Sequence, residues 1–381
     1  MFRILRCIVP RSLRRIALLA AALACGLFIG EFALRLLAID FPARDIGVVP
    51  HPLWHHWHRP EYAFTYRVAA EAISQEIHFN EHGMRDSRTI PLAKPFGALR
   101  VVVLGDSFVE ALQVAEHEGI CANLERSLRE QLGRPVEVLN FGCSGFSSVT
   151  EYCLLSKGAG QFAPDAVICL HHFSDMTEDW QLPKPPWEGG GPSSWKLLAQ
   201  RSQLCRVASG VADRCRRHRP PPDGASLKSS FDAVLRDPCN ADDQEAWDFS
   251  LGHVAEMASW CGERNLPFLL VVIPIGTQIE RVSAEFAEGV GFQYLAHGKL
   301  LENCNYQRRV TAYCQERGIE YLDLLPLFRA ANPNGQPCYY LPRDQHWTAA
   351  GHALAARHIM SYIVQQWTGR LRDEPRDIVT P

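Results

Sequence analysis

The stretch LRVVVLGDSFVEAL (99–112) decides how this chain folds. Its first residues form a short, mainly apolar run that ends in glycine, as expected of a strand that is buried on both faces of a parallel sheet. Gly105 is followed by Asp106 and Ser107, two residue types that favour turns and the first positions of helices. The pattern therefore predicts a buried strand that turns sharply into a helix, with a serine at the corner.

Similar apolar runs recur along the chain, and helical patterns of ten or more residues separate them. We expect strands at residues 99–105, 136–142, 165–173, 267–274 and 319–325. We expect helices at residues 117–132, 149–158, 300–317 and 348–367, and a further helix that ends near residue 265. Strands that alternate with helices in this way predict an α/β fold with a parallel, doubly wound sheet.

A stretch rich in Pro, Gly and Ser, at about 181–240, separates the third predicted strand from the fourth. We expect a loop-rich insertion there, with one helix in its middle, that forms a lid or a wall beside the substrate. Trp180, Trp187 and Trp195 either contact sugars or an acyl chain, or form a small local core.

The N-terminus carries an apolar stretch at 16–39, which is long enough to cross a hydrocarbon core of about 30 Å. Basic residues before it predict that 1–15 is cytoplasmic and that the rest of the chain faces outward. We therefore expect a single-pass anchor in the inner (cytoplasmic) membrane, with the remaining chain on the periplasmic or extracellular side. A cleaved signal peptide and a lipoprotein cysteine at Cys25 remain alternatives.

The chain thus divides into parts of different composition. We expect a cytoplasmic basic N-terminus at 1–15, a transmembrane anchor at 16–39, a juxtamembrane segment at 40–96, an α/β domain at 97–368 with the insertion at about 181–240, and a tail at 369–381. Four histidines of the juxtamembrane segment lie close together, namely His51, His55, His56 and His58. Their spacing differs from that of a catalytic zinc site, and we favour a belt of histidines and aromatic residues at the membrane interface.

Composition limits the possible partners. The chain has 381 residues and a formal net charge of −3, and its calculated isoelectric point of about 6.6 does not favour nucleic-acid binding. Its 13 cysteines are an odd number, so at least one thiol lacks an intrachain partner. Export would permit disulfides, for which Cys205/Cys215 and Cys304/Cys314 are candidates because of their proximity in sequence.

Three residue types suited to nucleophilic catalysis fall at the ends of predicted strands or just before the last helix. A serine hydroxyl becomes a good nucleophile only when a base removes its proton, and the base needs a group that orients it. Ser107 fits the nucleophile and His346 the base, while Asp344 lies two residues earlier, where a loop can return its carboxylate to the imidazole. Gly142 and Gly145 would let backbone N–H groups approach an oxyanion. Taken singly, each of these residues also fits a turn or a helix cap.

Together, four segments resemble in order the sequence blocks of the SGNH/GDSL hydrolase superfamily. They are VVVLGDSFVEALQV (101–114), VEVLNFGCSGFSS (136–148), FAPDAVICLHHFSDMTED (162–179) and YLPRDQHWTAAGHALAA (340–356). HFNEHGMRD (78–86) also resembles a segment that precedes the first block in many membrane-anchored members. The resemblance covers residues 78–180 and 246–368.

The resemblance implies a three-layer, flavodoxin-like fold and either hydrolysis or transfer of an acyl ester, with no metal and no organic cofactor. It assigns the nucleophile to Ser107 and the acid–base pair to Asp344 and His346, and it assigns oxyanion binding to Ser107 and Gly145. The third oxyanion position falls on Ser174, where the family carries an asparagine. A serine hydroxyl is a shorter and more mobile donor than an amide.

The leading interpretation is a membrane-anchored serine esterase that acts on an acyl ester, which includes acylated polysaccharides. A close alternative is an O-acetyltransferase that modifies a cell-surface polysaccharide, because Asp-Gln-His-Trp (344–347) resembles the corresponding block of alginate-acetylation proteins. A third interpretation is a non-catalytic carbohydrate-binding or scaffold protein on a degenerate hydrolase fold, for which the departure at Ser174 is the argument.

Overall fold

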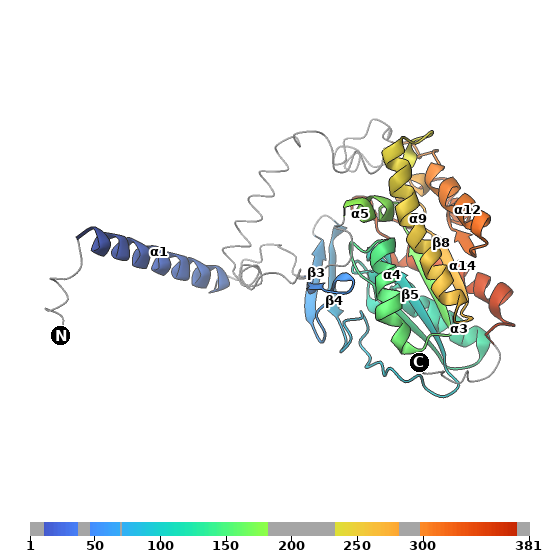
Figure 1. The fold of residues 1–381 in the computed structure, drawn as a ribbon, viewed down its shortest axis with the longest axis horizontal. Helices are drawn as coiled ribbons and strands as arrows, with labels where there is room; N and C mark the ends of the chain where they lie inside the picture. The colour runs from blue at the N-terminus through green and yellow to red at the C-terminus, as the bar shows by residue number, and fades with distance from the viewer. Residues whose placement is uncertain (1–10, 37–45, 69–70, 182–232, 282–297, 372–381) are drawn as a thin grey trace. The chain divides into compact units, whose positions relative to one another are not determined.

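The computed structural model describes residues 11–36, 46–68, 71–181, 233–281 and 298–371 (Figure 1). The chain divides into two units. One comprises Met1–Asp45 and Pro192–Gly224, and the other comprises Ile46–Gly191 and Ala225–Pro381. Most of the predicted insertion, including Trp187 and Trp195, lies outside the described residues.

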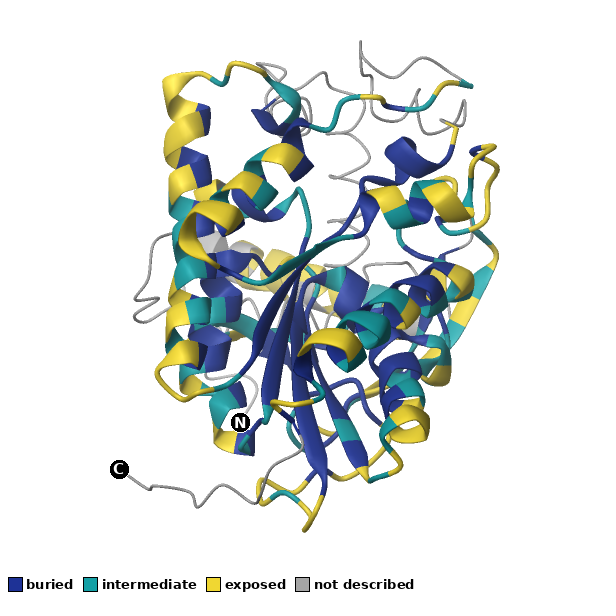
Figure 2. Ribbon diagram, turned by 90° about the vertical axis from the view of Figure 1, so that its right-hand side faces the viewer, coloured by how far each residue is buried: buried dark blue, intermediate teal, exposed yellow. Residues whose placement is uncertain are grey.

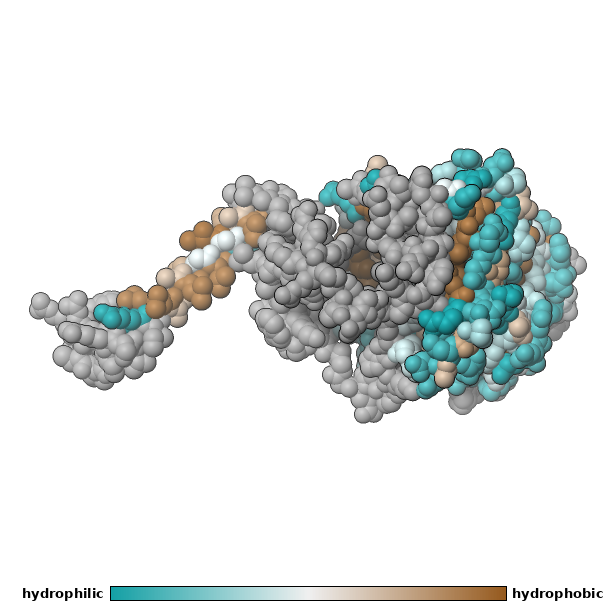
Figure 3. Space-filling view, turned by 90° about the horizontal axis from the view of Figure 1, so that it is seen from above, coloured by the Kyte–Doolittle hydropathy of each residue, from teal (hydrophilic) through white to brown (hydrophobic). Residues whose placement is uncertain are grey.

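In the first unit, the described part is helix α1 (Arg11–Leu36). Its window Ala17–Leu34 has a mean hydropathy of 2.1, and no other helix in the described parts of the chain is long and apolar enough to cross a membrane. Figure 3 shows its apolar side chains on the surface, and Leu18 and Phe28 are more than two-thirds exposed. The predicted segment at 16–39 is therefore an apolar helix of membrane-spanning length, a property that a signal sequence shares.

The second unit is built on one parallel sheet with the strand order β6-β5-β7-β8-β9. Its strands are β5 (Leu99–Gly105), β6 (Val136–Gly142), β7 (Ala166–His171), β8 (Phe268–Val272) and β9 (Tyr321–Asp323). Each lies within a predicted strand. In chain order the arrangement is second, first, third, fourth and fifth, which is the flavodoxin-like order. The predicted fold class is confirmed.

Helices cover both faces of this sheet, so that its strands are buried between two layers (Figure 2). Val102 and Leu104 of β5 face one apolar cluster, while Val101 and Val103 face the other, as the two-residue repeat of a strand requires. The first face carries α4 (Ser148–Lys157), α9 (Ala241–Gly262) and α12 (Asn305–Arg317). The second carries α3 (Ile120–Leu132), α13 (Leu325–Ala331) and α14 (Ala349–Trp367).

Two antiparallel hairpins precede the sheet. They are formed by β1 (Val48–His51) with β2 (His55–His58), and by β3 (Ala63–Val68) with β4 (Ile73–His78). The prediction of an interfacial belt is wrong for β2, because Trp57 and His58 are only 6% and 1% exposed. The Trp57 ring packs on Phe141 and Phe146 inside the domain.

The predicted disulfide between Cys304 and Cys314 is also wrong, since both are free. Cys304 caps the N-terminus of α12 and Cys314 lies near its C-terminus, and ten residues of helix separate them by about 15 Å. A disulfide requires Cα atoms within about 7 Å. The other predicted pair, Cys205 and Cys215, lies outside the described residues.

The close approach of the chain after β5 to strand β6 leads to a first prediction. A Cβ atom on Gly142 would lie 2.6 Å from the carbonyl carbon of Val109. We expect Gly142→Ala to lower the free energy of unfolding by about 2 kcal/mol or more, because backbone atoms must move. Gly252→Ala is the control. Its Cβ atom meets nothing within 4 Å on α9, so stability should rise by about 0.5–1 kcal/mol. Chemical denaturation measures both changes, and equal stability of the two variants would contradict the close approach.

Candidate active site

Ser107 is the first residue of the short helix α2 (Ser107–Glu110), which follows β5 directly. The side chain of Asp106 caps this helix by accepting a hydrogen bond from the N–H of Phe108 at 2.9 Å. The sequence allowed either Asp106 or Ser107 to cap the helix, and in the structure Asp106 does so. The hydroxyl of Ser107 is left for another partner.

Helix α2 is held tightly against strand β6. Gly142 leaves room for the backbone of Val109, as a side chain there would not. The amide of Asn140 donates to the carbonyl of Val109 at 2.9 Å. The buried guanidinium of Arg85 donates to the carbonyl of Glu110 at 3.0 Å and to two later carbonyls of the same turn. Burial lowers the pKa of Arg85 to about 10, which leaves it charged at neutral pH. These contacts fix the position of the serine.

The structure brings together the three residues predicted to carry the chemistry. Nε2 of His346 lies 2.6 Å from Oγ of Ser107, although 239 positions separate the two residues. Nδ1 of the same ring hydrogen-bonds Oδ1 of Asp344. Because an ionised carboxylate only accepts hydrogen bonds, Nδ1 carries the proton, and Nε2 is able to take the proton of the serine.

The loop that carries Asp344 and His346 is held from two other elements. Gln345 has a left-handed backbone with φ of +63°, which turns the Asp344 carboxylate back towards the imidazole. Oε1 of Glu71, in the turn between β3 and β4, accepts hydrogen bonds from the N–H groups of Arg343 (2.6 Å) and Asp344 (3.1 Å). The amide of Gln113 donates to Oδ1 of Asp344 at 3.3 Å. The acid therefore receives support that the sequence did not reveal.

Several charges set the proton affinity of His346. Burial lowers its pKa, but the hydrogen bond and charge of Asp344, with further negative charge on Asp106 and Glu110, raise it overall above the usual 6.5. The Phe108 ring packs against the His346 ring at a centroid distance of 5.0 Å. The imidazole is thus both more basic than an ordinary histidine and fixed in orientation.

Two backbone N–H groups are available near the end of β6 and the start of α2. Within the described residues, neither the N–H of Ser107 nor that of Gly145 has a hydrogen-bond acceptor. Gly145 has a φ of +79°, a conformation that glycine adopts without strain. Unpaired N–H groups of this kind suit the binding of a developing oxyanion.

The structure gives Ser174 a different partner from the one that the sequence suggested. Its Oγ lies 2.9 Å from Nδ1 of His172, just before α5 (Asp175–Gln181). Burial, together with the charge of His346, lowers the pKa of His172 well below its usual range, so the ring is neutral. If the Ser174 hydroxyl donates to Nδ1, the proton of His172 lies on Nε2. Ser174 then fixes the orientation of the His172 ring, whose Nε2–H is the hydrogen-bond donor.

Four carboxyl groups lie on α4 and α5, namely those of Glu151, Asp175, Glu178 and Asp179, and all of these residues except the half-buried Glu178 are buried. Each has one oxygen without a hydrogen-bond partner within the described residues. Burial raises all four pKa values, that of Glu178 to about 8, and repulsion from neighbouring carboxylates adds to the effect on Glu151, Asp175 and Glu178. Glu151, Asp175 and Glu178 therefore favour the neutral, protonated form and add little charge to the site.

Four supporting residues were missed from the sequence: Glu71, Arg85, Glu110 and Gln113. Glu110 stands three positions after Ser107, so its helical spacing from the serine was an available signal, whereas Gln113 lies beyond the end of α2 and had none. Arg85 lies in the segment HFNEHGMRD (78–86). The resemblance of this segment to membrane-anchored SGNH/GDSL members gave Arg85 itself no role. Nothing near Glu71 in the sequence pointed to the loop it holds, which is 273 positions away.

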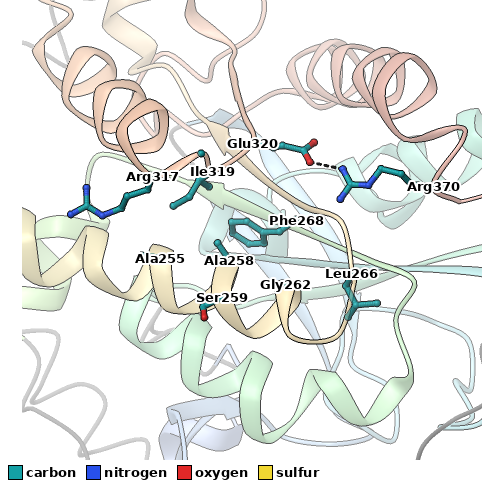
Figure 4. Close-up of a pocket in the computed structure, with 11 residues that line it drawn as sticks. Ala255, Ala258, Ser259, Gly262, Leu266, Phe268, Arg317, Ile319, Glu320 and Arg370 are labelled. Atoms are coloured by element: carbon teal, nitrogen blue, oxygen red, sulfur yellow. Dashed lines mark hydrogen bonds and ion pairs between the residues drawn. The ribbon is translucent and has the colours of Figure 1, made fainter.

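A surface cavity lies at the other end of the sheet (Figure 4). It has a volume of about 460 Å³ and is lined by residues that precede or begin strands, such as Leu266, Phe268 and Glu320. Because the strands are parallel, their amino ends lie opposite the edge at which Ser107 stands. The cavity is therefore not part of the triad site.

A family described as "SGNH hydrolase-like domain, acetyltransferase AlgX" matches residues 254–379, the segment that includes Asp344 and His346. None of the curated proteins matches the chain.

Solved structures with low sequence identity are also similar to the chain. An acetyl xylan esterase is 15% identical, with 70% of this chain and 100% of that chain covered and a TM-score of 0.40. A variant of an acetyl-xylooligosaccharide esterase from Geobacillus is 15% identical, with 73% and 99% covered and a TM-score of 0.38. A lipolytic protein of the G-D-S-L family from Veillonella parvula is 10% identical, with 71% and 98% covered and a TM-score of 0.38.

The family match covers one part of the domain, and the strand order and the four ordered sequence blocks extend across the rest. Residues 254–379 thus match an SGNH hydrolase-like domain, and they lie in an α/β domain whose parallel sheet has the flavodoxin-like strand order.

Proposed function

We propose that the protein is a serine esterase of SGNH type in which Ser107 is the nucleophile, His346 the general base and Asp344 the group that orients it. One observation supports this most. His346 Nε2 lies 2.6 Å from Ser107 Oγ, while the other ring nitrogen is bound to a carboxylate. A serine that only caps a helix has no need of an oriented base.

In the proposed reaction, the Ser107 hydroxyl proton passes to Nε2 of His346 as Oγ attacks the ester carbonyl carbon. The negative charge on the carbonyl oxygen is held by the N–H groups of Ser107 and Gly145 and by a third donor near Ser174. When the intermediate collapses, the alcohol leaves with the proton from His346, and the acyl group stays on Ser107. His346 then takes a proton from water as the water oxygen attacks the acyl carbon, and it returns that proton to Oγ of Ser107 when the acyl–Oγ bond breaks and the acid leaves.

We also propose that α1 is a membrane anchor with the α/β domain on its outer side. The support is the apolar window Ala17–Leu34 and the basic residues that precede it in the sequence. An enzyme anchored there would meet acyl esters of the periplasm or cell surface, acylated polysaccharides among them.

A second candidate is an O-acetyltransferase that acts on a cell-surface polysaccharide. The observation that favours it is the family match, because the matching family is described as an acetyltransferase and covers the segment with Asp344 and His346. Both candidates form the same acyl-enzyme on Ser107. They differ in whether water or a sugar hydroxyl accepts the acyl group.

The triad is tested by substitution. We expect Ser107→Ala and His346→Ala each to lower ester turnover by about 10⁴-fold or more, with Asp344→Asn about a hundredfold less severe. The double variant of His346→Ala with Asp344→Asn should be little worse than His346→Ala alone, because the residues act as a unit. Turnover is measured on short and long acyl esters, with and without a polysaccharide acceptor.

Ser156→Ala is the matched control, because within the described residues that hydroxyl bonds only to the backbone of its own helix. A fluorophosphonate probe should label the parent protein and not Ser107→Ala. Absence of labelling in the parent protein would favour the non-catalytic scaffold, and acyl transfer to the polysaccharide would favour the acetyltransferase.

The acid side of the pH profile follows from the charge around His346. A base must be unprotonated, so kcat/KM should rise with pH through the raised pKa of His346, with a midpoint above 6.5. Asp344→Asn removes the largest contribution that raises this pKa and leaves burial, which lowers it. We therefore expect the midpoint to move to lower pH in that variant. An unchanged midpoint would assign the acid limb to another group.

The pair of His172 and Ser174 is tested against a purely structural role. We expect Ser174→Ala to lower kcat about tenfold, because the ring of His172 loses its orienting partner, and His172→Ala to lower it about a hundredfold. Ser174→Asn should not lower kcat, because its amide supplies an N–H donor. The melting temperature should stay constant in the Ser174 variants. A change in melting temperature with constant kcat would remove both residues from oxyanion binding.

A further inference from the structure

We propose that strand β2 positions the oxyanion donor of the active site, with His56 holding the peptide between Ser144 and Gly145 and His58 holding Ser144 through Glu110. His56 and His58 are then positioning residues that lie before the sequence blocks that resemble SGNH/GDSL hydrolases. The inference rests on the proposed function, in which the N–H of Gly145 binds the oxyanion.

The first contact is made by His56. Its Nε2 lies 3.0 Å from the carbonyl oxygen of Ser144, which belongs to the same peptide unit as the N–H of Gly145. A trans peptide is planar, so its carbonyl and its N–H point in opposite directions. A group that fixes the Ser144 carbonyl therefore also fixes the direction of the Gly145 N–H. The ring also lies beside Gly145, since a Cβ atom on that glycine would be 3.9 Å from Nε2.

The protonation state of His56 suits this task. Burial lowers its pKa to about 4, although the Ser144 carbonyl acts in the opposite direction, so the ring is neutral at physiological pH. Since a carbonyl only accepts hydrogen bonds, the single proton lies on Nε2. Nδ1 is then an acceptor, and Nδ1 of His55 lies 2.7 Å from it as the donor. The ring also packs edge-on against Phe146, with centroids 4.9 Å apart.

The second contact runs through the buried carboxylate of Glu110. Oε2 accepts hydrogen bonds from the N–H of Ser144, at 2.8 Å, and from its hydroxyl. Oε1 lies 2.8 Å from Nε2 of His58, whose Nδ1 faces the carbonyl of Gly83 at 2.9 Å. Both ring nitrogens of His58 thus face hydrogen-bond acceptors. Burial raises the pKa of Glu110, but the charge of His58 and the hydrogen bonds lower it overall, which keeps the carboxylate ionised.

Both sides of Ser144 are therefore bound, its N–H through Glu110 and its carbonyl directly by His56. Rotation of the Ser144–Gly145 peptide, which would turn the Gly145 N–H away from the reacting oxygen, would break the hydrogen bond to His56. The stretch from His55 to His58, which looked from sequence like a membrane-interface belt, instead supports the reaction centre.

The experiment compares two substitutions of similar volume. His56→Met keeps the packing against Phe146 and removes the N–H donor, and His56→Gln retains a donor near the position of Nε2. With p-nitrophenyl acetate as substrate, we expect His56→Met to lower kcat about 10- to 100-fold with KM changed less than about threefold. His56→Gln should restore most of kcat. Inhibition by an arylboronic acid, which mimics the tetrahedral intermediate, should weaken in parallel with kcat.

His51→Ala is the control on the same hairpin, because His51 stacks on Trp54 and accepts a hydrogen bond from the N–H of Leu53. Within the described part of the chain, its ring makes no hydrogen bond to residues 143–145. Its kcat should match that of the parent protein. If Ser107→Ala abolishes turnover while His56→Met retains full kcat, this inference is overturned and the proposed function stands. If Ser107→Ala retains turnover, both are overturned. Equal losses in His56→Met and His56→Gln would also contradict the role of the N–H donor.

Discussion

The short helix α2 has to sit directly against strand β6, and the active site depends on this close contact. It is possible because Gly142 presents no side chain to Val109, and it is maintained by Asn140 and Arg85, which bind the carbonyls of the helix. From this position Ser107 reaches His346, and Glu110 reaches the N–H of Ser144. One helical turn thus presents the proposed nucleophile and also holds the loop of the proposed oxyanion donor.

Burial raises the pKa of every carboxyl group in this region, but the net shift differs between them, and a neighbouring positive charge together with hydrogen bonding accounts for the difference. Glu110 is fully buried but has a facing imidazole and two donors from Ser144, so its pKa is lowered overall. Glu151 and Asp175 are equally buried, yet each has an oxygen without a partner, and their pKa values are raised well above the usual range. The charged carboxylates are therefore those with a structural task.

Sequence reasoning located the scaffold better than the supports of the site. The apolar runs located all five strands of the parallel sheet, because a strand buried on both faces leaves a strong local pattern. The same reasoning failed for His58, since the burial of a histidine depends on a carboxylate 52 positions away. It failed again for Cys304 and Cys314, where closeness in sequence suggested a bond that a rigid helix between them prevents.

The sequence by itself determined the fold class, because the periodicity of buried strands and helices is a local property that can be seen in a single chain. It also nominated Ser107, Asp344 and His346, through residue type, strand ends and the resemblance of four segments to SGNH/GDSL hydrolases. Only the tertiary structure decided which groups orient them. Glu71 and His56 act on backbone atoms of distant loops, and a hydrogen bond to a backbone N–H or carbonyl places no requirement on the side chain of its partner. Such contacts therefore leave no complementary residue to find. They appear only when the folded chain brings the two segments within about 3 Å of each other.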